Sequence, residues 1–176
     1  MRCSVRLIGN VEPQTSAVRA ALAGVEVCDD DVLPFRACHP QLIVVAGWRH
    51  MIPPDVLAQP PLGVVGFHSA KLPEYPGRAP IYWTLLRGDE RAYNTMLFLD
   101  ARVDSGDIID AESRRIGADD TPETLYEWVA ESDARMLTRH LPALLAGTAP
   151  RVPQDMTRRG PLTSADGYRR WLNQSS

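Results

Sequence analysis

The most informative stretch of the chain opens with Gly63-Val64-Val65-Gly66-Phe67, an apolar run that ends on His68. The next segment, Leu72-Pro73-Glu74-Tyr75-Pro76-Gly77-Arg78-Ala79-Pro80, is too rich in proline and glycine for a helix or a central strand. The stretch closes on Val103-Asp104-Ser105-Gly106-Asp107-Ile108-Ile109, a short turn that carries carboxylates. Open α/β sheets place their chemistry at the carboxyl ends of buried strands. The pattern therefore predicts a site in which Asp104 orients or charges His68.

Apolar runs and helical periodicity alternate on both sides of this stretch, which predicts a parallel α/β sheet. The predicted strands span residues 3–8, 25–28, 42–46, 63–67, 94–99 and 108–114. Helices are expected from an N-cap at Thr15, at 53–57, at 80–86 and at 122–145, where Pro142 should kink or split the last one. Residues 1–150 are expected to form the α/β domain, and residues 151–176 a polar C-terminal extension.

Composition narrows the function classes. A net charge of −3 argues against a nucleic-acid partner, and the chain contains no membrane-length apolar run and no signal peptide. Cys3, Cys28 and Cys38 fit neither a disulfide framework nor a zinc module, so we expect no metal and a reducing, cytoplasmic setting. The acidic run at 29–31 is expected to be a solvated turn and helix start.

The ordered motifs resemble the folate-dependent formyltransferases, which include methionyl-tRNA, glycinamide ribonucleotide and amino-sugar N-formyltransferases. Gly66-Phe67-His68 stands at the family's Asn-x-His position, and the 72–77 loop stands at its SLLPxYRG-like loop. Ala79-Pro80 opens the helix that follows, and Val103-Asp104-Ser105-Gly106 matches the Asp turn. Upstream, the 44–53 segment is similar to the family's strand end. The likeness covers about residues 40–128, whereas the segment before Pro40 looks short by one βα unit.

This resemblance implies a Rossmann-like, mostly parallel sheet with helices on both faces. It also implies an N-formyltransferase that uses 10-formyltetrahydrofolate as co-substrate and a primary amine of a small molecule as acceptor. His68 and Asp104 are the implied catalytic residues. The implied folate-binding positions are Gly47, Trp48, Ile52, Tyr75, Val103 and Asp104. Trp48 and Tyr75 could line a pterin-sized slot or simply pack locally. A homodimer remains open.

The departures from the family pattern concern catalysis. The family's Asn is Gly66 here, Ser69 follows His68 where Pro is common, and Pro76 replaces the loop Arg. Without an amide at position 66, another donor must stabilise the oxyanion of the tetrahedral intermediate. Asn94 is the first candidate, because a polar residue there begins an otherwise apolar strand. A backbone N–H beside Gly66, an ordered water, or a purely structural Asn94 are the alternatives.

Three other functions stay in view. A tRNA acceptor is less expected, because the tRNA-acting relatives carry a separate C-terminal barrel that this chain has no room for. A folate-dependent hydrolase could use the same histidine and aspartate without any amine. A non-catalytic folate-binding homologue is the third alternative, in which Gly66 marks a lost active site.

Overall fold

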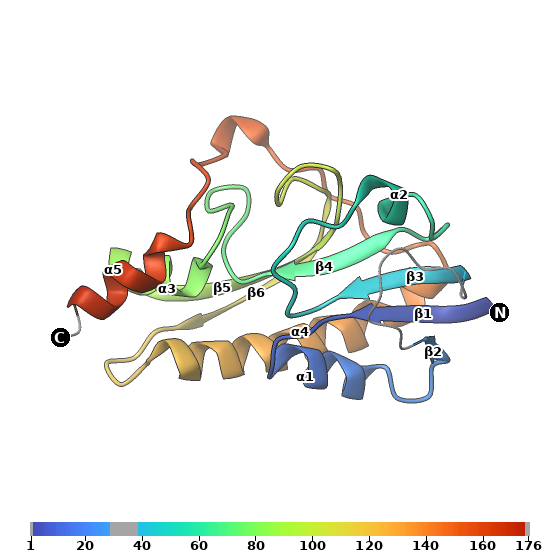
Figure 1. The fold of residues 1–176 in the computed structure, drawn as a ribbon, viewed down its shortest axis with the longest axis horizontal. Coiled ribbons are helices and arrows are strands. Elements are labelled where there is room, and N and C mark those ends of the chain that lie inside the picture. Colours follow the sequence, from blue (N-terminus) through green and yellow to red (C-terminus); the bar gives the residue numbers. More distant parts are fainter. Residues whose placement is uncertain (1, 29–38, 175–176) are drawn as a thin grey trace.

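One sheet with the strand order β2-β1-β3-β4-β5-β6 forms the centre of the computed structural model, which describes residues 2–28 and 39–174 (Figure 1). Its strands are β1 (Arg2–Ile8), β2 (Val27–Cys28), β3 (His39–Val45), β4 (Val64–His68), β5 (Arg91–Phe98) and β6 (Ile108–Arg115). The helices are α1 (Gln14–Ala21), α2 (Pro54–Leu57), α3 (Pro80–Arg87), α4 (Pro122–Leu145), the 3₁₀ turn η1 (Met156–Arg158) and α5 (Asp166–Gln174).

The strands of the sheet do not all run in the same direction. β2, β1, β3 and β4 are parallel, whereas β5 pairs antiparallel with both β4 and β6. The Rossmann-like, mostly parallel sheet predicted from the sequence is therefore confirmed, but β5 departs from the all-parallel pattern that simple alternation suggested. In this register His68 lies directly opposite Thr95.

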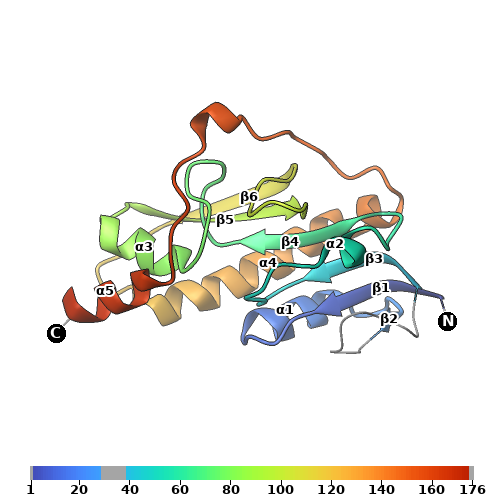
Figure 2. The ribbon, with the colours of Figure 1, turned by 45° about the horizontal axis from the view of Figure 1, so that its top comes forward.

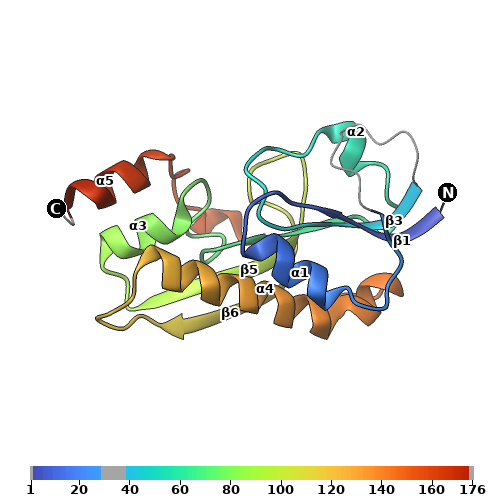
Figure 3. The same ribbon diagram turned by 60° about the horizontal axis from the view of Figure 1, so that its bottom comes forward.

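Alternate residues of the central strands are buried on opposite faces of the sheet, as expected of strands covered on both sides. Val5, Leu7 and Val44 belong to the core between the sheet and the helices α1 and α4, which lie side by side below it (Figures 1 and 3). Ile43 and Val45 belong to the other face and pack with residues of α2. The loops that carry the candidate site rise from this second face, which α1 and α4 do not cover (Figure 1).

Two predicted helix details are wrong. The Thr15 side chain does not cap α1, because its hydroxyl donates to the carbonyl oxygens of Val11 (3.0 Å) and Ala46 (3.3 Å). This contact ties the first turn of α1 to the end of β3. Pro142 does not split α4, because it lies in the last turn, where the helix ends three residues later at Leu145. The side chain of Thr121 caps the N-terminus of α4, with Thr124 as its reciprocal partner.

The segment after α4 does not project away from the sheet. It arches over the loops above β4 and β5 and returns to α3 as α5 (Figure 2). There the ring of Tyr82 in α3 meets those of Tyr168 and Trp171 at centroid distances of 4.9 Å and 6.0 Å. Trp83 also donates from its indole N–H to the Ser164 carbonyl at 2.8 Å. The predicted polar extension is thus packed against the α/β domain.

The cysteines differ from expectation. Cys28, at the end of β2, takes part in a disulfide bond, whereas the spacing of the cysteines predicts no disulfide framework. The acidic run at 29–31 and Cys38 fall outside the described residues. Within the described ranges, no group of three His, Cys, Asp or Glu side chains is arranged to hold a metal ion. None of the helices in those ranges has the length and apolar character needed to cross a bilayer.

Candidate active site

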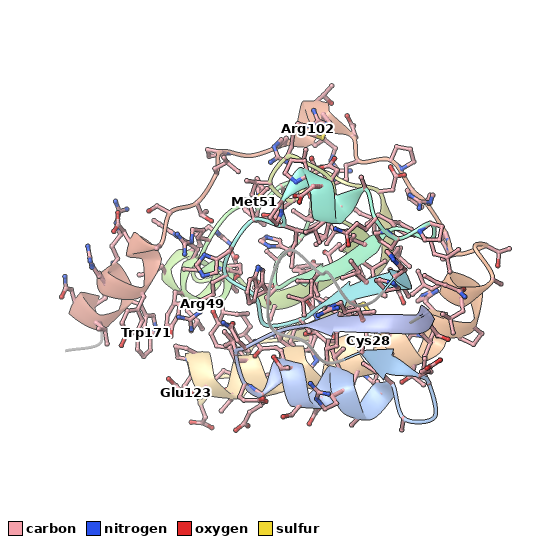
Figure 4. All side chains as sticks on the ribbon, turned by 45° about the vertical axis from the view of Figure 1, so that its right-hand side comes forward. Cys28, Arg49, Met51, Arg102, Glu123 and Trp171 are labelled. Atoms are coloured by element: carbon pink, nitrogen blue, oxygen red, sulfur yellow. The ribbon has the colours of Figure 1, made fainter. Side chains whose placement is uncertain are left out.

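A cleft of about 120 Å³ opens on the face of the sheet opposite α1 and α4. Three segments form its walls: the loop after β3, the middle of β4, and the loop between β5 and β6. Met51 and Arg102, from the first and third of these segments, mark its upper rim (Figure 4). The lining residues are Val45, Gly47, Trp48, His50, Met51, Ile52, Gly66, Phe67, Leu99, Asp100, Arg102, Val103 and Asp104.

Gly47 fixes the path of the first wall. Its φ of 59° lies in the left-handed region, and a Cβ atom there would come within 2.4 Å of the Val11 carbonyl oxygen. Only glycine satisfies both constraints without a shift of the backbone. The Asn10 N–H donates to the Gly47 carbonyl at 3.3 Å, so the turn after β1 supports the loop from behind.

His68 is the last residue of β4, and its side chain is 7% exposed. Its Nε2 lies 2.8 Å from the Tyr75 carbonyl oxygen, to which it donates, and its Nδ1 lies 3.5 Å from Oδ2 of Asp104. Both ring nitrogens therefore face oxygen acceptors. The ring of His68 therefore lies between the carbonyl of the 72–77 loop and the carboxylate of the Asp104 turn.

Asp104 joins the two loops above the sheet. Its Oδ2 accepts a hydrogen bond of 2.8 Å from the backbone N–H of Gly77 and also faces His68. The residue has a φ of 47°, which a side chain other than glycine adopts only when its surroundings impose it. Gly106 completes the turn, because a Cβ atom there would lie 1.8 Å from the Phe98 carbonyl oxygen.

Most of the predicted folate-binding residues meet in the cleft. Gly47, Trp48, Ile52, Val103 and Asp104 all line it. The Tyr75 side chain does not. Its ring is 36% exposed and lies under the Arg87 guanidinium at 4.0 Å, so it contributes to the site only through the carbonyl that contacts His68.

The structure does not bring Asn94 to His68. Thr95 lies opposite His68 in the ladder, so the side chain of its neighbour Asn94 points to the other face of the sheet. There it is fully buried, and its Nδ2 donates to Oδ1 of Asp133 (2.7 Å) and to the Val129 carbonyl (3.4 Å) in α4. The prediction that Asn94 donates to the oxyanion is therefore wrong, because register and packing turn the amide away from the site.

The space that the side chain of the family's Asn would occupy beside Gly66 is filled by the side chain of Leu99. A Cβ atom built on Gly66 would lie 3.1 Å from both Cδ atoms of Leu99. Leu99 follows β5, and its N–H donates to the Val64 carbonyl at 2.7 Å. Its isobutyl group thus covers Gly66 inside the cleft, where the resemblance predicts an amide.

Sequence reasoning missed several lining residues, among them Leu99 and Asp100. Asp100 organises the turn: its carboxylate accepts from the Ser105 hydroxyl (2.7 and 2.9 Å) and from the Arg102 N–H (2.9 Å). Their position in the sequence, directly before the Asp104 turn, could have indicated them, because residues that flank a motif in one loop often line the same cleft.

Comparisons with known proteins agree with this geometry. A family model described as "Formyl transferase" matches residues 17–141. Methionyl-tRNA formyltransferase of Pelotomaculum thermopropionicum is 37% identical over 134 residues, which cover 75% of this chain and 43% of that protein. The Syntrophus aciditrophicus enzyme of the same name is 37% identical over 140 residues, covering 78% and 45%. The chain thus spans less than half the length of these curated relatives.

Solved structures share the fold. The formyltransferase PseJ from Anoxybacillus kamchatkensis, in complex with UDP-4,6-dideoxy-4-formamido-L-AltNAc and tetrahydrofolate, superimposes with a TM-score of 0.78 at 21% identity, covering 97% of this chain and 90% of PseJ. A sugar N-formyltransferase from a Shewanella species gives a TM-score of 0.75 at 15% identity, covering 96% and 79%. Since the family model matches well over half of the described sequence, the chain belongs to the formyl transferase family.

Proposed function

We propose that this protein is an N-formyltransferase that uses 10-formyltetrahydrofolate and a primary amine carried by a small molecule. The observation that carries the proposal is the pairing of His68 with Asp104 beside the cleft, 3.5 Å apart, at the two positions where the family motifs predict them. The membership of the chain in the formyl transferase family supports it.

Transfer of an acyl group to an amine passes through a tetrahedral oxyanion, which needs a donor for the negative charge and an acceptor for the amine proton. His68 is the donor, and the Asp104 carboxylate, 3.5 Å from its Nδ1, orients the ring. His68 Nε2 now donates to the Tyr75 carbonyl, so a substrate oxygen would compete with that carbonyl for the same proton.

The cleft residues fit a reduced folate, which would supply the formyl group when bound. The walls of the cleft are apolar at Ile52 and Val103 and bare of a side chain at Gly47. Backbone groups of the two loops are therefore open to a planar, polar ring. Trp48 would contribute an aromatic edge.

An amino sugar on a nucleotide is the first acceptor class to test. PseJ, whose complex contains a formamido sugar nucleotide and tetrahydrofolate, shares the fold of this chain with a TM-score of 0.78. The experiment incubates the protein with 10-formyltetrahydrofolate and either UDP-linked amino sugars or methionyl-tRNA, and follows tetrahydrofolate release and product mass. Formylated sugar supports the proposal, and formylation of methionyl-tRNA alone overturns the acceptor.

A folate-binding homologue with impaired catalysis is the second candidate. The covering of Gly66 by Leu99 favours it, because the site then lacks a side-chain amide that could donate to the oxyanion. Binding of a reduced folate without turnover of any amine would identify this function. Release of formate from the folate in the absence of any amine would instead identify a hydrolase.

A further inference from the structure

The segment of residues 152–163, here named the strap, crosses both loops that carry the His68–Asp104 pair (Figure 2). At one end Val152 exchanges two backbone hydrogen bonds with Ile108, of 2.8 and 2.9 Å. At the other end the Thr163 N–H donates to the Pro76 carbonyl (3.0 Å), and the Thr163 carbonyl accepts from the Arg78 N–H (2.9 Å). The strap is therefore anchored beyond the Asp104 turn on one side and at the 73–78 loop on the other.

Gln154 points from the strap into the Asp104 turn. Its Nε2 donates to the carbonyl oxygens of Asp104 (3.1 Å) and Gly106 (2.7 Å). One amide group thus satisfies two carbonyls that lie two residues apart. Because both of its N–H bonds are used, the side chain fixes the spacing of these carbonyls.

Arg159 approaches the same turn from the other end of the strap. Its Nη2 donates to the Val103 carbonyl at 2.6 Å, and its Nη1 donates to the Asp104 carbonyl at 3.3 Å. The Asp104 carbonyl therefore accepts from both side chains. A positively charged fork holds two consecutive carbonyls more firmly than a neutral donor does. Together the two residues hold the carbonyls on either side of the left-handed Asp104 backbone, which has a φ of 47°.

The strap also fixes the opposite loop. Arg158 forms an ion pair with Glu74, and the Gly160 N–H donates to the Pro73 carbonyl at 3.3 Å. A Cβ atom at Gly160 would lie 2.0 Å from the Glu74 carbonyl oxygen, so the strap lies directly on this loop. The loop provides the Tyr75 carbonyl to His68 and the Gly77 N–H to Asp104. One segment thus sets the positions of both partners of the pair.

We propose that Gln154 and Arg159 are positioning residues of the active site, which hold the Asp104 turn so that its carboxylate faces His68 and its backbone lines the folate cleft. The inference rests on the proposed function of the His68–Asp104 pair. Neither residue lines the cleft, so each acts through the turn rather than on a substrate. The strap is in this sense part of the site, although it follows the family match at 17–141 in the chain.

The test compares the double variant Gln154→Met/Arg159→Met with the matched control Thr157→Ala in the full chain. Methionine retains much of the length of both side chains but removes the donors. Thr157, on the same strap, contacts only Asp155 through its side chain. Two readouts are used: the ring resonances of His68 by NMR at a fixed pH, with Asp104→Ala as the reference for a lost pair, and calorimetric affinity for 5-formyltetrahydrofolate. Circular dichroism checks that each variant is folded.

In the double variant we expect the His68 resonances to move toward those of Asp104→Ala and affinity for the folate probe to fall about tenfold. Thr157→Ala should match the wild type in both readouts. Wild-type His68 resonances in a folded double variant would overturn the inference. If the double variant does not fold, the single variants Gln154→Met and Arg159→Lys are read by the same criteria. A wild-type protein that does not bind the probe would count against the proposed function, while the NMR arm would still decide the role of the strap.

Discussion

Leu99 and Gly66 share one volume inside the cleft. The two Cδ atoms of Leu99 lie 3.1 Å from the position that a Cβ atom of residue 66 would occupy, which is closer than ordinary van der Waals contact. The backbone of Gly66 is not in the left-handed region, so space rather than strain excludes a side chain there. The loss of the family's amide and the presence of a leucine at 99 are therefore linked.

This link predicts a dependence between two substitutions. Gly66→Asn alone should lower the free energy of unfolding by about 1–3 kcal/mol, because the new side chain overpacks the space under Leu99. In a Leu99→Ala background the same change should cost clearly less. Urea unfolding of the four proteins in this cycle measures the coupling, and equal costs in both backgrounds would contradict it. If the oxyanion lacks a donor, turnover should rise only in the double variant.

The His68–Asp104 pair predicts a second result. His68→Ala and Asp104→Ala should each reduce formyl transfer by about 10²–10³-fold, the usual effect of losing a donor to the oxyanion. The two residues act as one unit, so the double variant should be little worse than either single variant. Steady-state rates with the amine that the acceptor assay identifies provide the measurement. Losses that multiply would argue that the residues act independently.

Asn94 provides a contrasting control for the site. Asn94→Ala removes the amide that donates to Asp133, and leaving that buried carboxyl group without its partner should cost about 1–3 kcal/mol of stability. Turnover per folded molecule should remain near the wild-type value, because the side chain lies on the far face of the sheet. Urea unfolding and active-site-normalised rates test both halves. A loss of turnover without a loss of stability would be the contrary outcome.

Asp133 predicts how stability depends on pH. Burial raises the pKa of its carboxyl group well above the ordinary value, and the nearby charge of Glu112 adds to this, while the hydrogen bond from Asn94 opposes it. The folded chain therefore retains a proton that the unfolded chain loses above about pH 4. Stability should fall as pH rises through the window between these two pKa values.

The variant Asp133→Asn retains the shape of the side chain and removes its titration. Relative to this variant, the wild type should lose stability as pH rises above about 4, by up to about 1.4 kcal/mol per pH unit. Unfolding free energies of both proteins across that range provide the measurement. Parallel profiles would show that Asp133 is ionised in the folded chain.

Local sequence patterns predicted the parts of this molecule that local chemistry determines. The apolar run before His68, the proline-rich loop and the Asp104 turn lie where the motifs placed them, and their side chains meet. Each of these elements is specified by residues adjacent in the sequence, so a linear reading is sufficient.

Contacts between residues far apart in the sequence could not be predicted from these local patterns. The antiparallel register of β5 against β4 determines the face of the sheet to which the Asn94 side chain points. The covering of Gly66 by Leu99 joins two strands, and Gln154 meets Asp104 across 50 residues of sequence. Periodicity within one element contains no information about these pairings.

The place of the strap near the end of the chain bears on how the site forms during translation. Residues 152–163 leave the ribosome after every strand and after α4, yet they provide hydrogen bonds to Asp104, Gly106, Pro76 and Arg78. A nascent chain can pair its strands while these carbonyls and N–H groups are still bonded to water. The His68–Asp104 pair would then be fixed in place only after translation has passed the strap, so the sheet forms before the loops above it are held.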